Sequence, residues 1–197
     1  EFSIMLGQTE LMSSRRTGSE QALATIACRK IRDRRSASVL IGGLGMGFTL
    51  RAALAELSAD ARVTVAELVP AVVTWASGPM AELYGSYLDD PRLKIRVEDV
   101  ATTIGSVRSE FDAILLDVDN GPEGLTQTLN HRLYSLEGLR RAHGALRPHG
   151  VLAVWGSARD DAFSQRLARA GFSAGVTPVR AGGARGSRNF IWIGSRD

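Results

Sequence analysis

Apolar and polar residues follow two different periods along this chain. Short, nearly continuous apolar runs predict buried strands, and apolar residues spaced three or four positions apart predict helices. The two kinds of segment alternate, which is typical of a parallel sheet with helices on both faces. We therefore predict an α/β protein with an open, mostly parallel sheet. The first predicted strand and its glycine loop lie at 38–47, and the later strands lie at 63–66, 93–97, 111–116, 151–155, 172–180 and 189–194. Predicted helices begin near residues 17, 46, 70 and 100. One more helix ends near 146, and another spans about 160–170.

The first residues follow a different pattern. Residues 1–14 alternate as a short hairpin would, and the helix from about 17 to 31 follows it. We predict that 1–36 form an N-terminal hairpin and helix appendage, and that 37–197 form the Rossmann-like domain. The sequence starts at Glu1 rather than methionine, which suggests that an earlier piece is missing. Further along, Pro148-His149-Gly150 predicts a turn before the strand at 151–155.

A glycine cluster ends the first strand of the predicted sheet. Gly43, Gly45 and Gly47 follow the apolar run at 39–41, and a helical pattern starts behind them. Glycine accepts positive φ and lets a ligand approach the backbone, while a helix start offers free N–H groups. Phe48 breaks the G-x-G-x-x-G dinucleotide fingerprint, and the chain has no G-K-[ST] motif of a P-loop. The loop thus favours a nucleoside-type cofactor over NAD or ATP, with an ordinary strand-to-helix turn as the alternative.

Three acidic residues directly follow predicted strands, namely Glu67, Asp99 and Asp117. Ligands of open α/β sheets bind beyond the carboxyl ends of the strands. Glu67 is placed to accept hydrogen bonds from both ribose hydroxyls. Asp99 can accept one from an exocyclic amine while the N–H of Val100 donates to a ring nitrogen, which would suit adenine. Each acid alone has an alternative as a helix cap or turn residue.

The segment Asp117-Val118-Asp119-Asn120 carries the sharpest chemical signal. Two carboxylates follow a strongly apolar strand, with no lysine or arginine nearby in the sequence. Burial and a neighbouring like charge both raise a carboxyl pKa. Such a group can take a proton from an amine or hydroxyl, or hold a cation. The alternative is an Asx-type turn, since Asp-Asn-Gly-Pro is strong turn chemistry.

Composition narrows the remaining classes. The 197 residues carry a net charge of +3, and the apolar runs fall short of a membrane span, so we expect no membrane partner. Cys28 is the single cysteine, which excludes an internal disulfide and suggests a reducing, cytoplasmic location. Three scattered histidines argue against a structural zinc site, and we predict no metal. The basic run at 29–35 lacks interleaved aromatic residues, so we favour a solvated surface over nucleic-acid binding.

Taken together, the motifs resemble one known family. The glycine loop, Glu67, Asp99-Val100 and the stretch 115–122 are similar, in this order, to the spermidine synthases, or polyamine aminopropyltransferases. The resemblance covers about residues 4–156. It implies the Rossmann-like fold that this family shares with class I S-adenosylmethionine-dependent methyltransferases. It also suggests a homodimer.

The resemblance implies a role for each matching residue. The three loop glycines would line the thioether and the amino-acid or aminopropyl end of the cofactor, and Glu67 would bind its ribose. Asp99, Val100 and Pro122 would enclose adenine. Asp117 matches the family's catalytic acid, and Asp119 and Asn120 would contact the substrate amine. The cofactor would be decarboxylated S-adenosylmethionine, and the acceptor a small-molecule amine.

The chain differs from the family at positions that commonly bind the cationic amines. Met46 stands where the family commonly has an Asp, Gly18-Ser19-Glu20 replaces Tyr-His-Glu, and Asn120 replaces a second Asp. The leading hypothesis is therefore an aminopropyltransferase-like enzyme. The alternatives are a methyltransferase that uses S-adenosylmethionine itself, with an unknown acceptor, and a non-catalytic nucleoside- or partner-binding protein.

Overall fold

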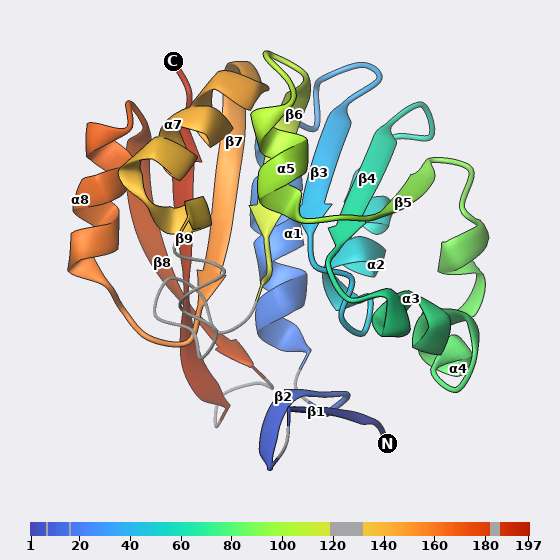
Figure 1. The fold of residues 1–197 in the computed structure, drawn as a ribbon. Coiled ribbons are helices and arrows are strands. Elements are labelled where there is room, and N and C mark those ends of the chain that lie inside the picture. The colour runs from blue at the N-terminus through green and yellow to red at the C-terminus, as the bar shows by residue number, and fades with distance from the viewer. Residues whose placement is uncertain (7, 16, 119–131, 182–185) are drawn as a thin grey trace.

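A seven-stranded sheet forms the centre of the protein, in the order β5-β4-β3-β6-β7-β9-β8 (Figure 1). The computed structural model describes residues 1–6, 8–15, 17–118, 132–181 and 186–197. Strands β3 to β7 pair in parallel, whereas β9 pairs antiparallel with both β7 and β8. The strands are β3 (Ser38–Gly42), β4 (Arg62–Glu67), β5 (Leu93–Val97), β6 (Phe111–Leu116), β7 (Leu146–Gly156), β8 (Ser173–Ala181) and β9 (Ser187–Ser195).

Helices cover both faces of this sheet, as predicted. The first face carries α1 (Gly18–Lys30), α2 (Phe48–Glu56), α3 (Pro70–Ser77) and α4 (Ala81–Tyr84), and the second carries α5 (Val100–Gly105), α7 (Leu136–Ala145) and α8 (Asp161–Arg169). Each group of helices buries its apolar side chains in a separate core, one on each side of the sheet. Strand β6 is buried along its whole length because both cores contact it. The predicted fold class is therefore confirmed.

One local prediction was wrong, and one helical segment was not predicted. The expected turn at Pro148–Gly150 lies inside β7, which already begins at Leu146. The register between β6 and β7 shifts between Phe111 and Ala113, and His149 adopts a φ of 60°. The proline and glycine are thus absorbed by an irregularity in the ladder. In addition, residues 81–89 form α4 and a 3-10 helix, η1 (Gly85–Asp89), which the sequence pattern did not predict.

The N-terminal hairpin is confirmed as β1 (Ser3–Leu6) paired antiparallel with β2 (Thr9–Ser13). It lies apart from the main sheet, below the edge where β3 and β4 end (Figure 1). Helix α1 instead packs into the core of the first face, where Leu23, Ala24 and Ala27 are fully buried. The division of the chain at residue 36 stays a prediction.

At the other end of the strands, where β6 begins, ionic contacts gather around Asp112, a residue of β6 that is 1% exposed. Its carboxylate accepts hydrogen bonds from the backbone N–H of Ser38 at 2.8 Å, from Arg34 at 2.8 Å and from Arg147 at 2.9 Å. Arg34 belongs to the basic run at 29–35, and within that run Arg29 also pairs with Glu56. These two arginines of the run therefore form ion pairs within the protein itself.

Candidate active site

Parallel pairing brings the ends of β4, β3 and β6 side by side. Gly42, the last residue of β3, pairs with Ala66 of β4 and with Leu116 of β6. The ladder continues one step beyond the strands, because Gly43 donates to the carbonyl of Ala66 at 2.9 Å and Asp117 donates to the carbonyl of Gly42 at 3.1 Å. The glycine loop is thus flanked by the residues that follow β4 and β6.

The loop requires glycine at its first position. Gly43 has a φ of 90°, and a Cβ there would lie 2.6 Å from the carbonyl oxygen of Asp117. A side chain would therefore meet backbone as well as an unfavourable conformation. Gly45 and Gly47 also have positive φ, at 51° and 78°. The expectation that these glycines shape a tight strand-to-helix turn agrees with this geometry.

Two side chains from elsewhere in the chain pack on the loop. Tyr84 at the end of α4 is 2% exposed, and its hydroxyl donates to the carbonyl of Gly45 at 2.6 Å. Its ring lies against Gly47, where a Cβ would come within 2.4 Å of Cε1. Met12 of β2 occupies the equivalent space beside Gly45. Burial and the nearby charge of Glu67 raise the pKa of Tyr84, so this hydroxyl stays protonated and acts as a donor.

Glu67 ends β4 and points at the loop. One carboxylate oxygen accepts a hydrogen bond from the N–H of Leu44 at 2.7 Å, and the other accepts one from the N–H of Val69 at 2.8 Å. A carboxylate has about four lone-pair positions, so both oxygens can still accept from further donors such as hydroxyls. The next residue, Leu68, is 53% exposed, and it offers an apolar surface beside the acid.

Asp99 and Val100 have separate positions at the start of α5. Asp99 is exposed and caps the helix by accepting from the N–H of Ala101 at 2.8 Å, which matches the helix-cap alternative. Val100 is 5% exposed and packs over Gly42, with both its methyl groups within 3.2 Å of where a Cβ would stand. Val100 therefore lies at the start of the glycine loop, while Asp99 lies farther out.

Asp117 is the chemically unusual acid of the site. The residue is half-buried, and the net effect of its surroundings raises the pKa of its carboxyl group from 3.8 to about 7, with loss of hydration as the largest cause. The negative charge of Glu20 in α1 also contributes to this rise, whereas a 2.6 Å hydrogen bond from the hydroxyl of Thr49 acts against it. Among the described residues, no lysine or arginine forms an ion pair with Asp117. The carboxyl group can consequently change its charge near neutral pH.

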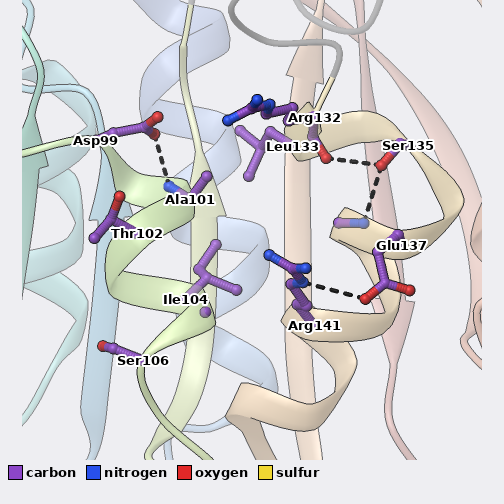
Figure 2. A pocket seen from close by; sticks show the side chains of 12 residues that line it. Asp99, Ala101, Thr102, Ile104, Ser106, Arg132, Leu133, Ser135, Glu137 and Arg141 are labelled. Atoms are coloured by element: carbon purple, nitrogen blue, oxygen red, sulfur yellow. Dashed lines mark hydrogen bonds and ion pairs between the residues drawn. The ribbon is translucent and has the colours of Figure 1, made fainter.

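A cavity of about 600 Å³ opens between α5 and α7, and Figure 2 shows its lining. Asp99 stands at one end, and Ser106 and Arg141 stand toward the other (Figure 2). Of the predicted site residues, Asp99 alone lines it, so this cavity is not centred on the glycine loop or on Asp117.

Three predicted site residues, Asp119, Asn120 and Pro122, lie outside the described residues. The structure thus brings together at one edge of the sheet the residues Gly43, Gly45, Gly47, Glu67, Val100 and Asp117, with Asp99 beside them.

The described part of the chain contains no group of three or more histidine, cysteine, aspartate or glutamate residues that could hold a metal ion. None of the described helices is long and apolar enough to cross a membrane.

Comparison with known proteins agrees with this arrangement. No family model matches the chain. Polyamine aminopropyltransferase 2 of Pseudomonas aeruginosa is 33% identical over 138 residues, which are 66% of this chain and 37% of that protein. A spermidine synthase solved with the transition-state analogue AdoDATO superposes with a TM-score of 0.74 at 18% identity, over 95% of this chain and 62% of the other. The chain is spermidine synthase-like.

The fold extends beyond this one group. An O-methyltransferase candidate from Klebsiella pneumoniae superposes with a TM-score of 0.62 at 16% identity, over 98% of this chain and 84% of the other. The protein therefore has the class I methyltransferase fold of the spermidine synthase-like proteins. It spans little more than a third of the length of its Pseudomonas relative.

Two residues of the site were not predicted from the sequence. Thr49 contacts Asp117 from 68 residues away, and Tyr84 contacts Gly45 from 39 residues away. Thr49 stands two residues after Gly47, inside the helical pattern, and this placement was the available signal. Tyr84 lies in a segment where no helix was expected, so nothing in its sequence neighbourhood indicated a contact with the loop.

Proposed function

We propose that this chain is a spermidine synthase-like transferase, which moves an aminopropyl group from decarboxylated S-adenosylmethionine to a small amine. The observation that carries the proposal is the half-buried Asp117 beside the glycine loop, whose pKa of about 7 suits a general base near neutral pH. It follows β6 directly beside the glycine loop, at the sheet edge where ligands of open α/β folds bind. The similarity of the whole chain to the polyamine aminopropyltransferases supports the same reaction.

The residues present fit an adenosine-bearing donor. The free acceptor capacity of Glu67 suits two ribose hydroxyls, and the exposed Leu68 and Val97 offer apolar contact to a base. We assign the glycine loop to the thioether end, and Asp99, Val100 and Pro122 to adenine. Asp119 and Asn120 are assigned to the amine.

In the proposed reaction, Asp117 takes a proton from the ammonium form of the acceptor. The freed nitrogen lone pair attacks the propyl carbon beside the sulfonium and forms the new C–N bond. The C–S bond breaks, its electron pair neutralises the sulfur, and methylthioadenosine leaves. The product is a secondary ammonium ion, and Asp117 then releases its proton to water. No metal ion takes part, and positioning together with proton removal supplies the rate.

A methyltransferase is the second candidate, and Met46 favours it. This side chain is 1% exposed within the apolar core of the first face, so the loop lacks an acid that would pair with an aminopropyl ammonium group. Because no acid stands at this position, the loop also lacks a negative charge that would repel the carboxylate of intact S-adenosylmethionine. The two candidates thus differ by one carboxylate on the donor.

Calorimetry with methylthioadenosine, S-adenosylmethionine and its decarboxylated form tests the donor, and mass spectrometry of amines incubated with each donor tests the transfer. We expect methylthioadenosine to bind and an aminopropylated amine to form. Asp117→Asn should abolish transfer while methylthioadenosine still binds. A methylated product would establish the second candidate, and binding without any transfer would leave a nucleoside-binding protein.

We also propose that the protein is a homodimer with a cytoplasmic location, and light scattering tests the homodimer.

A further inference from the structure

Thr49 is the one hydrogen-bond donor to the Asp117 carboxyl group among the described residues. It lies in the first turn of α2 and is 3% exposed. Its Oγ1 stands 2.6 Å from Oδ2 of Asp117 and 3.4 Å from the carbonyl oxygen of Glu20. A threonine hydroxyl has a single proton, so the shorter contact marks the bond that it donates.

We propose that Thr49 is a positioning residue, which holds Asp117 through Oδ2 and leaves Oδ1 to receive the proton of the acceptor amine. The proposal rests on the function proposed above, in which Asp117 is the base. Threonine suits the task because its branched side chain has few allowed rotamers in a helix. Burial of the hydroxyl between α1, α2 and the end of β6 restricts it further.

The charges around this pair explain why the hydroxyl matters. Within the described part of the chain, Glu20 is the charged group that acts on Asp117, and its repulsion favours the protonated carboxyl. One oxygen of Glu20 accepts from Ser19 at 2.7 Å. Thr49 opposes both this repulsion and the cost of burial, because it donates to the ionised form. The first turn of α2 adds the positive end of a helix dipole.

Two variants separate the hydroxyl from the shape of the side chain. Thr49→Val keeps the branched volume and removes the donor, whereas Thr49→Ser keeps the donor and removes a methyl group. The Asp117 carboxyl is followed by carbon-13 NMR during a pH titration of the full chain, and Asp117→Asn identifies its signal. Hydrogen bonds to charged groups suggest that Thr49→Val raises the proton affinity of Asp117 about tenfold, which is about one pH unit.

Turnover provides the second measurement. In Thr49→Val, the acid limb of the kcat/KM profile should move to higher pH and kcat at neutral pH should fall, while methylthioadenosine affinity stays unchanged. Thr49→Ser should behave as the natural protein does. Thermal unfolding of each variant checks that it folds, and Thr49→Ala replaces Thr49→Val if the latter does not.

The proposal is overturned if Asp117 titrates in Thr49→Val or Thr49→Ala as it does in the natural protein. It is also overturned if the serine variant matches the valine variant, because shape rather than the hydroxyl would then be decisive. Failure to transfer any group to any amine would refute the proposed function instead. The NMR titration needs no substrate, so it still decides whether Thr49 controls the carboxyl.

Discussion

The carboxylate of Glu67 joins two segments through backbone N–H groups, since it accepts from Leu44 at 2.7 Å and from Val69 at 2.8 Å. Leu44 belongs to the glycine loop, and Val69 precedes α3. Because Glu67 is 7% exposed, these donors have no ready replacement in water. The acid therefore fixes the loop as well as offering lone pairs to a ligand.

Glu67→Gln should weaken both roles. An amide nitrogen cannot accept a hydrogen bond, so one of the two N–H groups loses its partner, at a cost of about 1–3 kcal/mol in the free energy of unfolding. Urea denaturation measures this loss, and calorimetry should find weaker methylthioadenosine binding. Glu82→Gln on the exposed side of α4 is the matched control. Equal stability of the two variants would contradict the structural role of Glu67.

The stability of the protein should depend on the charge of Asp117. Its pKa is about 7 in the folded chain and near 3.8 when unfolded, so between these values the native state holds a proton that the unfolded state has lost. The free energy of unfolding therefore falls as pH rises from about 4 to about 7. The three-unit difference corresponds to about 4 kcal/mol.

Asp117→Asn should lack this loss, because an amide does not ionise. Denaturant unfolding of both proteins from pH 4 to pH 8 should give similar values at the acidic end and a growing advantage for the variant toward pH 8. Curves that run parallel across the whole range would mean that Asp117 titrates as an ordinary surface acid.

Gly43→Ala should disrupt the junction between the loop and β6. The new Cβ would lie 2.6 Å from the backbone oxygen of Asp117, and alanine would have to adopt a φ of 90°. Together these effects should cost about 3 kcal/mol. Gly175→Ala in β8 is the control, since no atom lies within 4 Å of its Cβ position. A tolerated Gly43→Ala would imply a different path for the loop.

Asp112→Asn should destabilise the other end of the strands, where β6 begins. It removes the charge of a carboxylate that is itself buried and that pairs with the half-buried Arg34 and Arg147, and this loss should cost about 3 kcal/mol. Chemical denaturation should detect this, while Asp33→Asn, whose side chain is 94% exposed, should leave stability nearly unchanged. If the two variants unfold alike, the ionic contacts around Asp112 contribute little.

The sequence predicted the parts of the fold that depend on local pattern. The apolar run of β6, the glycines after β3 and the acids after β4 and β6 each identify a strand and its end, and parallel pairing then brings the ends together. Pro148 and Gly150 misled the prediction because turn residues can also occupy an irregular strand. Contacts of Thr49 and Tyr84 depend on how distant elements pack, and no local period encodes them.

The strand β6 carries an aspartate at each end, and the protein treats the two in opposite ways. Asp112 accepts hydrogen bonds from two arginines and one backbone N–H group, whereas Asp117 faces another acid and one hydroxyl. The contacts of Asp112 stabilise the strand, so the strand does not depend on the side chain of Asp117. Changes at residue 117 can therefore alter reactivity while the framework persists, which leaves that end of the strand open to evolutionary change.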